Sequence, residues 1–92
     1  MTYQLLYSNR FKKSLKKCHK KGLDIEKLRL AIKTLVENGN LPAEYRPHKL
    51  VGKYNGIWEC HISPDWLLLW EQNDTCLTML MVDTGTHSDI FG

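Results

Sequence analysis

The order of secondary-structure patterns along the chain constrains its fold more than any other feature. Apolar residues alternate with polar ones near the start and then recur at helical spacing in two segments. Three short β-like runs follow at about residues 57–62, 66–71 and 76–82. The predicted order is strand, helix, helix, strand, strand, strand (βααβββ). This order favours an α+β fold, in which two N-terminal helices cover one face of a mainly antiparallel sheet and leave the other face partly open.

Capping residues set the predicted ends of the two helices. Asn9 and Asp24 are of the types that cap helix N-termini. Gly22 and Gly39 are expected to end the helices, because glycine readily adopts the left-handed conformation found there. The chain has 92 residues, the length of one small domain, so we expect residues 1–92 to form a single domain.

The alternation of side chains along a strand assigns residues of the first β-like run to opposite faces of the sheet. Trp58, Cys60 and Ile62 share one face, which we assign to the core. Glu59 and His61 share the other face. Functional groups are expected on this open face, so His61 is predicted to point out of the sheet.

Charge is divided unevenly between the two halves of the chain. All 13 Lys and Arg residues lie from Arg10 to Lys53 with four acidic residues among them, whereas six acidic residues and no Lys or Arg follow. On the first helix, lysines recur in pairs at positions 12–13, 16–17 and 20–21 and form one cationic face. Such a face can be merely solubilising. Its lysines nevertheless repel one another, and no acidic residues lie among them to offset this repulsion. The face therefore favours a polyanionic partner, either ribosomal or messenger RNA or an acidic protein.

Cysteine usage and the N-terminal sequence indicate a cytoplasmic protein. Cys18, Cys60 and Cys76 are odd in number and widely spaced, which fits reduced packing residues better than a disulfide framework. The N-terminus lacks a signal-peptide pattern, and no apolar run is long enough to span a bilayer. We therefore expect no membrane partner.

Three histidines and one aspartate are candidates for acid–base chemistry. Imidazole titrates near neutrality, so His48, His61 and His87 could supply a base for a ribose 2′-OH and an acid for the leaving 5′-oxygen of RNA. Asp65 could orient one of these rings or exchange a proton with it. A histidine in an arbitrary chain is more often a surface residue. Strand geometry and neighbouring motifs favour a catalytic role for His61 and His87.

A zinc site and a cysteine nucleophile are weaker interpretations of the same residues. Neither an HExxH nor a CxxC spacing occurs, and Cys60 is predicted to face away from His61. We therefore expect no metal and no other cofactor. Among the aromatic residues, Trp66 and Phe91 are predicted to stack on RNA bases, because each adjoins a motif at a turn or chain end.

Several short motifs occur together in this chain. They are Leu41-Pro42, His48-Lys49-Leu50-x-Gly52, Gly56-x-x-Glu59-x-His61-Ile62-x-Pro64-Asp65-Trp66-Leu67-Leu68 and Gly85-Thr86-His87-Ser88-Asp89-x-Phe91-Gly92. In this combination, and in the βααβββ order, the chain resembles YafQ-type toxins of the RelE superfamily over nearly its whole length. The resemblance implies a RelE-like fold. It also implies an active site formed by His48, His61, Asp65, Trp66, His87 and Phe91.

The resemblance further implies an activity and partners. Such toxins belong to type II toxin-antitoxin systems and are cytoplasmic, ribosome-dependent endoribonucleases that cut messenger RNA in the ribosomal A site. Metal-free attack by the 2′-OH would leave a 2′,3′-cyclic phosphate and a 5′-OH end. A cognate antitoxin, expected to be a small acidic DNA-binding protein, neutralises the toxin and links it indirectly to operator DNA.

Two positions depart from the pattern of many relatives, which have arginine where this chain has Trp58 and Asp83. An arginine near the scissile phosphate would stabilise developing negative charge, whereas a carboxylate would repel it. We predict that Arg46, Lys49 and Lys53 bind the substrate and supply the missing cation. Alternatively, the chain is a weakly active or inactive binding module that acts with its antitoxin in DNA-binding autorepression.

Overall fold

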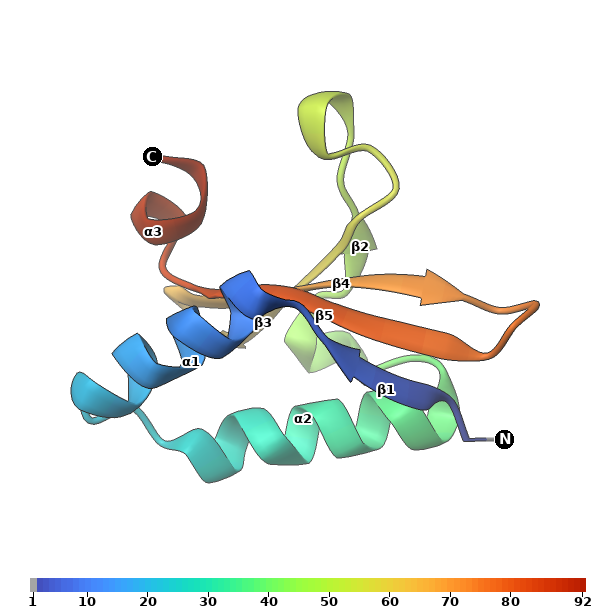
Figure 1. Cartoon of the computed structure of the whole chain (residues 1–92), viewed down its shortest axis with the longest axis horizontal. Helices are drawn as coiled ribbons and strands as arrows, with labels where there is room; N and C mark the ends of the chain where they lie inside the picture. Colours follow the sequence, from blue (N-terminus) through green and yellow to red (C-terminus); the bar gives the residue numbers. More distant parts are fainter. Residues whose placement is uncertain (1) are drawn as a thin grey trace.

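The computed structural model describes residues 2–92 as a five-stranded sheet with helices on both sides (Figure 1). The elements are β1 (Gln4–Tyr7), α1 (Asn9–Lys20), α2 (Ile25–Asn38), the 3-10 helix η1 (Ala43–Tyr45), β2 (His48–Lys49), the 3-10 helix η2 (Gly52–Tyr54), β3 (Trp58–Ser63), β4 (Trp66–Asn73), β5 (Thr78–Gly85) and α3 (His87–Phe91). The strand order is β1-β5-β4-β3-β2. Only β1 pairs in parallel, with β5. The predicted α+β class and mainly antiparallel sheet are confirmed.

The helix boundaries follow from local capping, with one change from the prediction. Ser8, not Asn9, caps α1, because its hydroxyl oxygen accepts a hydrogen bond from the Phe11 N–H at 2.9 Å. The same hydroxyl donates to the Val82 carbonyl at 2.7 Å and so fixes α1 to β5. Asp24 caps α2 as predicted, and Gly39 ends it with a φ of 75°.

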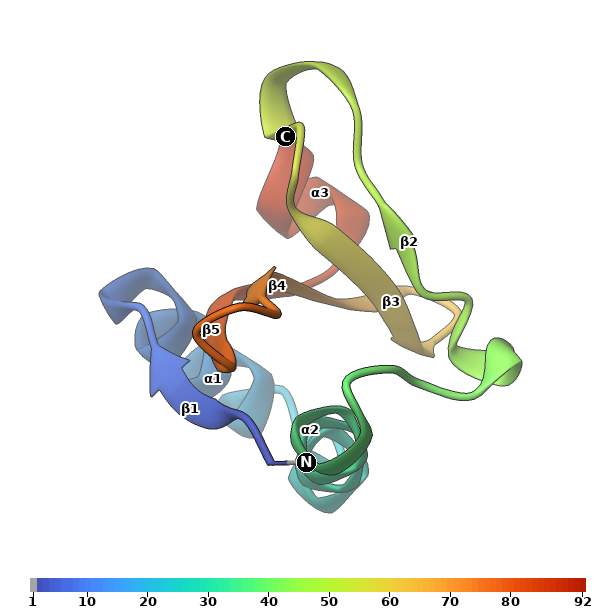
Figure 2. The ribbon, with the colours of Figure 1, turned by 90° about the vertical axis from the view of Figure 1, so that its right-hand side faces the viewer.

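Two short elements were missed by the sequence analysis. The connection expected to lack strands contains β2, and the chain ends in helix α3. A strand of two residues and a helix of five are both too short to show periodicity, so the βααβββ prediction was incomplete. Both views show that α3 and the segment from β2 to β3 rise from the face of the sheet opposite α2 (Figures 1 and 2).

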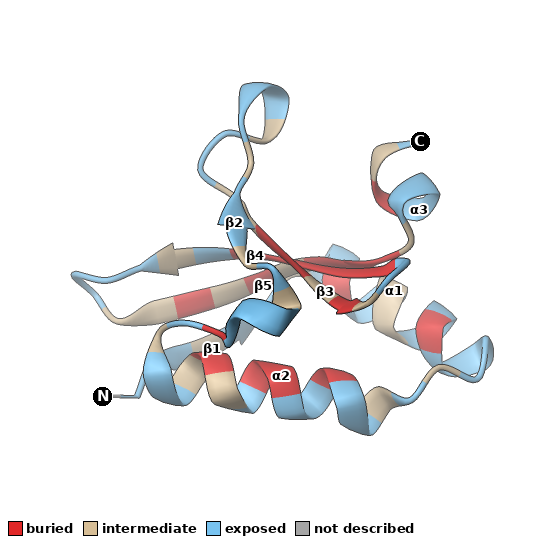
Figure 3. Ribbon diagram, turned by 180° about the vertical axis from the view of Figure 1, so that it is seen from behind, coloured by how far each residue is buried: buried red, intermediate tan, exposed pale blue. Residues whose placement is uncertain are grey.

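The sheet consequently has a large core on one face and a small one on the other. The large core lies against α1 and α2 and includes Cys60 and Ile62, as predicted, while Trp58 is only partly buried beside it. The small core consists of Leu67, Leu69 and Ile90, with partly buried neighbours from the segment between β2 and β3. The face expected to be partly open is therefore covered near α3 (Figure 3). Within residues 2–92, no helix has the length and apolar content needed to cross a membrane.

Candidate active site

The predicted histidines converge on the face of the sheet that carries the small core. His61 is in register with Leu67, and Leu67 with Gly85, so one row crosses β3, β4 and β5. His87 follows two residues after Gly85. In a second row, His48 of β2 is paired with Glu59 of β3. Cross-strand partners project to the same face, and residues two apart along a strand lie about 7 Å from each other. His48, Glu59 and His61 therefore share a face, as the period-two rule predicted for the last two.

The His48 ring is held between two oxygen acceptors. Its Nδ1 lies 2.9 Å from the Arg46 carbonyl oxygen, and its Nε2 lies 3.2 Å from Glu59 Oε1. Each ring nitrogen of His48 therefore faces one oxygen. Glu59 is only 4% exposed. The sequence analysis put Glu59 on this face but gave it no role. The signal available in the sequence was that Glu59 lies two residues before His61 and therefore on the same face of the strand.

His61 has an unused ring nitrogen at this face. The side chain is partly buried, and its Nδ1 is a fully buried polar atom without a hydrogen-bond partner among the described residues. Buried polar groups in native proteins normally have a partner. An unpartnered imidazole nitrogen on the face that also carries the His48–Glu59 pair is well suited to accept or donate a proton during a reaction.

His87 and Phe91 lie one above the other on α3. Their ring centroids are 5.2 Å apart. The Tyr54 ring of η2 meets Phe91 edge-on, with centroids 5.1 Å apart. This contact connects the loop before β3 to the C-terminal helix. Tyr54 was not predicted to contribute to the site, because residues so far apart in sequence give no periodic signal of their contact.

Asp65 and Trp66 differ in their surroundings. Asp65 is exposed in the turn between β3 and β4, at the same end of the sheet as Gly85. Trp66 is 4% exposed and belongs to the large core, and its indole N–H donates to the Thr84 hydroxyl at 2.9 Å. The structure therefore does not bring Trp66 together with the histidines, and its ring has no open face for a base.

The three predicted cations are also separated. The backbone of Arg46 contacts His48, and Lys53 Nζ lies 5.7 Å from the centroid of the Tyr54 ring. Both residues are thus beside the histidine face. Lys49 Nζ instead lies 5.6 Å above the Trp58 ring, on the opposite face. Lys49 is not brought together with the other candidates.

The two positions that depart from the family pattern are both engaged elsewhere. Asp83 is 3% exposed and points towards α1, where its carboxylate lies 2.8 Å from Arg10 Nε and accepts a hydrogen bond from the Ser14 hydroxyl. Trp58 stacks on Trp70, with centroids 5.9 Å apart. Arg10 therefore partly offsets the negative charge of Asp83, and the expected repulsion of a phosphate stays a prediction.

Comparison with known proteins identifies the family. The family described as "Bacterial toxin of type II toxin-antitoxin system, YafQ" matches residues 3–92. The chain belongs to the YafQ toxin family. The resemblance predicted from the motifs is confirmed, and YafQ-family membership makes the chain the toxin of a type II toxin-antitoxin system.

Relatives of this YafQ-family chain have been named and solved. The "mRNA interferase toxin YafQ" of Escherichia coli K12 is 36% identical over 87 residues, which are 94% of this chain and 92% of the relative. The toxin chain in the E. coli DinJ-YafQ toxin-antitoxin complex is 32% identical, with full coverage of both chains and a TM-score of 0.90. A metal-bound toxin from Helicobacter pylori is 32% identical, with 99% of this chain and 100% of that one covered and a TM-score of 0.88.

Possible metal ligands were compared across the part of the YafQ-family chain that the structure describes. Within residues 2–92, no three His, Cys, Asp or Glu side chains come close enough together to hold a metal ion. At the site, His48 Nε2 is already engaged by Glu59.

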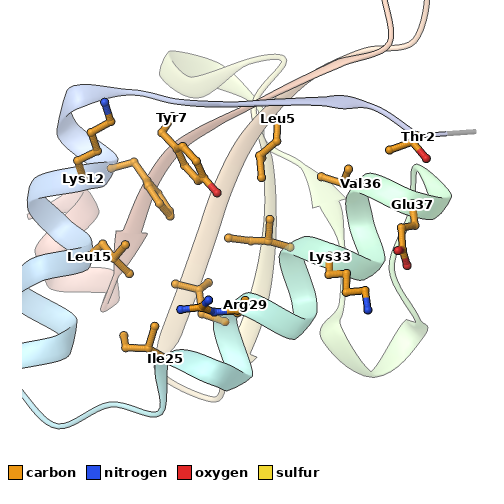
Figure 4. A pocket seen from close by; sticks show the side chains of 13 residues that line it. Thr2, Leu5, Tyr7, Lys12, Leu15, Ile25, Arg29, Lys33, Val36 and Glu37 are labelled. Carbon is orange, nitrogen blue, oxygen red and sulfur yellow. The ribbon is translucent and has the colours of Figure 1, made fainter.

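A groove lies on the other side of this YafQ-family toxin, between β1, α1 and α2 (Figure 4). Its volume is about 530 Å³, and apolar side chains of all three elements form most of its surface. Lys12, Arg29 and Lys33 also line it, with Glu37 as the acidic residue among the lining side chains. The groove contains no predicted catalytic residue.

Proposed function

We propose that this YafQ-family chain is a ribosome-dependent endoribonuclease that cleaves messenger RNA in the A site. The observation that carries the proposal is that His48 and His61 share the face of the sheet from which α3 rises with His87, while His61 Nδ1 has no partner among the described residues. The name of the E. coli relative, an mRNA interferase, supports the same activity. Dependence on the ribosome and the A site as the place of cleavage are part of the proposal.

The proposed reaction is an attack of the ribose 2′-oxygen on the adjacent phosphorus. The 2′-O–P bond forms as the P–O5′ bond breaks, which leaves a 2′,3′-cyclic phosphate and a 5′-OH end. His61 and His87 share the roles of base and acid. One ring takes the proton of the 2′-OH, and the other gives a proton to the leaving 5′-oxygen. Asp65, exposed in the turn between β3 and β4, orients one ring or exchanges a proton with it.

Charge that develops on the phosphate needs donors. The His48 ring held by Glu59 can supply one, and Arg46 and Lys53 can supply others from beside the same face. Phe91 offers a partly exposed aromatic ring for the nucleotide next to His87. The lysines of α1 provide the electrostatic attraction to ribosomal RNA.

The proposed partner that silences the toxin is a small acidic antitoxin, which also links the toxin to operator DNA. The DinJ-YafQ complex of the E. coli relative supports an antitoxin for this chain. The groove between β1, α1 and α2 supports an acidic amphipathic segment as its occupant, because apolar side chains line it together with Lys12, Arg29 and Lys33. The cytoplasm is the proposed site of action, where ribosomes and messenger RNA are present.

The alternative of an inactive binding module loses its main support. It was motivated by Asp83 and Trp58 in place of family arginines. Asp83 is buried and paired with Arg10, and Trp58 stacks on Trp70. An active enzyme is therefore the function that the geometry favours.

Induction of the chain in bacteria tests the proposal. Growth curves and primer extension on an abundant message should show arrest and discrete cuts. Both should disappear in His61→Ala and His87→Ala. His19→Ala, which removes an exposed histidine of α1, is the matched control and should cut as the parent does. A soluble, folded parent that neither slows growth nor cuts messages would contradict the proposal.

A further inference from the structure

Helix α3 has only five residues, and helices of that length are unstable on their own in water. Its position must therefore come from contacts with the rest of the protein. Ile90 enters the small core, and Phe91 packs against Tyr54. The third contact is an ion pair between Asp89 and Lys21, in which Lys21 Nζ lies 3.1 Å from Asp89 Oδ2.

Asp89 also forms hydrogen bonds with Thr86 at the start of α3. Its Oδ2 accepts a hydrogen bond from the Thr86 N–H at 3.1 Å, while the Thr86 hydroxyl accepts one from the Asp89 N–H at 3.1 Å. These reciprocal bonds form a capping box, which fixes the first turn of the helix. The Thr86 backbone N–H, followed by Lys21, holds the pKa of Asp89 below its usual value.

Gly85 allows the Asp89 carboxylate to reach this place. Its φ is 150°, and a Cβ atom at this position would lie 3.1 Å from both Cβ and Oδ2 of Asp89. Side chains rarely tolerate contacts that close or a φ in this range. The end of β5, the cap of α3 and the end of α1 therefore meet around one carboxylate.

His87 lies between the two residues of the capping box. Its backbone is set by Thr86 and Asp89, and its ring lies at a tilt of 49° to that of Phe91 one turn later. We propose that Asp89 and Lys21 are positioning residues for His87, with Lys21 linking the orientation of α3 to the end of α1. This inference deepens the proposed function and rests on it for the role of His87. Neither Lys21 nor Asp89 was predicted to act at the site.

Kinetics of ribosome-dependent cleavage separate positioning from attraction to RNA. Asp89→Ala removes both the cap and the ion pair, and a lost cap of this kind should lower kcat by about tenfold with little change in KM. Asp89→Asn keeps an oxygen acceptor for Thr86 and should lower kcat by only about two- to threefold. Lys21→Gln should match Asp89→Asn in kcat. Lys20→Gln removes a neighbouring cation that has no contact with Asp89, so any rise in KM that it shares with Lys21→Gln reflects RNA attraction.

A measurement on the free toxin tests the positioning directly. The histidine ring signals and the amide hydrogen exchange of residues 86–91 can be followed by NMR in the non-toxic His61→Ala background. Asp89→Ala should move the His87 signals further than Asp89→Asn, and it should speed exchange in α3 while the His48 signals stay in place. Both Asp89 variants lose the same charge, so their difference reports the cap.

The outcomes distinguish this inference from the proposed function. Unchanged α3 exchange and equal His87 signals in the two Asp89 variants would overturn the positioning role, whatever the cleavage rates. An effect of Lys20→Gln on kcat equal to that of Lys21→Gln would overturn the role of the ion pair. A parent that does not cleave RNA would contradict the proposed function alone, because the NMR comparison still decides how His87 is held.

Discussion

Arg10 Nε lies 2.8 Å from Asp83 Oδ2, and this ion pair joins the buried Asp83 carboxylate of β5 to α1. Ser14 donates a hydrogen bond to the same carboxylate. A residue that looked like an electrostatic defect in the sequence is therefore part of the contact between α1 and β5. We therefore expect a substitution of Asp83 to change the stability of the protein, and to change catalysis only by disturbing the fold.

Asp83→Arg should destabilise the protein. The new guanidinium would lie in a buried site beside Arg10, and leaving a buried charge without its partner typically costs about 3–5 kcal/mol. Urea unfolding measures the loss. Glu71→Arg is the matched control, because it reverses a charge at an exposed position of β4 and should change stability by less than about 0.5 kcal/mol. The double variant Arg10→Asp/Asp83→Arg should recover part of the loss. Equal effects of the two single reversals would contradict the role of the buried pair.

Glu59→Gln should weaken cleavage more than it weakens the fold. The amide keeps an oxygen near His48 Nε2 but removes the carboxylate charge that faces the ring. Hydrogen bonds to charged groups contribute about 1.5–3 kcal/mol, so kcat/KM should fall by about 10- to 100-fold. Single-turnover cleavage on programmed ribosomes is the measurement, and Glu71→Gln, at an exposed position, is the control. A parent-like rate for Glu59→Gln would show that the pair does not assist the reaction.

The sequence predicted the elements in which the apolar pattern repeats several times. The stripes of α1 and α2 extend over three or more turns, and the alternation in β3 correctly separated Cys60 from His61. The face of Trp66 could not be predicted in this way. Every residue from Trp66 to Trp70 is buried, since β4 lies at the centre of the sheet between two cores.

Other parts of the site depend on contacts between distant segments. The pairing of Asp83 with Arg10 joins β5 to α1, and that of Tyr54 with Phe91 joins η2 to α3. No local pattern encodes such pairs. The histidines were found because imidazole chemistry can be recognised from residue type and motif, whereas the residues that hold the histidines in place have ordinary roles elsewhere in proteins.

Tyr54→Leu should reduce cleavage, and Tyr54→Phe should not. The edge-on contact with Phe91 needs a ring but no hydroxyl, and aromatic pairs contribute about 0.5–1.5 kcal/mol beyond their burial. Loss of the ring should therefore lower kcat by roughly two- to tenfold. Cleavage kinetics of both variants, with thermal unfolding as a check of folding, measure the effect. If Tyr54→Phe were as impaired as Tyr54→Leu, the hydroxyl and not the ring contact would be responsible.

The three cysteines should react with thiol reagents at very different rates. Burial, and secondarily the charge of Glu59, raises the pKa of the Cys60 thiol to about 12, and burial also raises the pKa of Cys18. Cys76 is exposed. Because the thiolate is the reactive form, a disulfide reagent at pH 8 should modify only Cys76 in the folded protein. Cys76→Ser should abolish the fast phase. Fast labelling of Cys60 in that variant would contradict its burial.

The same Cys60 shift has a defined effect on stability. Its pKa in the folded chain lies above the value of 9.0 for a free cysteine thiol, so the folded state retains a proton that the unfolded state loses. The stabilisation is complete below pH 9 and decreases as the pH rises towards 12, by about 1.4 kcal/mol per pH unit. Cys60→Ala should remove this component from the pH dependence of urea unfolding. A parent and variant with parallel profiles above pH 9 would contradict it.

The groove between β1, α1 and α2 gives a prediction for the antitoxin. Lys33→Glu reverses a charge in the groove lining, and an acidic segment seated there should bind about tenfold more weakly, with the difference shrinking at high salt because charge interactions across a partly exposed groove are screened. Lys27→Glu makes the same change on the same helix at an exposed position outside the groove and should bind as the parent does. Calorimetric titration of the cognate antitoxin into catalytically silent His61→Ala toxin measures both affinities. Equal affinity of the two variants would mean that the antitoxin does not use the groove, while the histidine face and its proposed chemistry would be unaffected, because the groove contains none of the predicted catalytic residues.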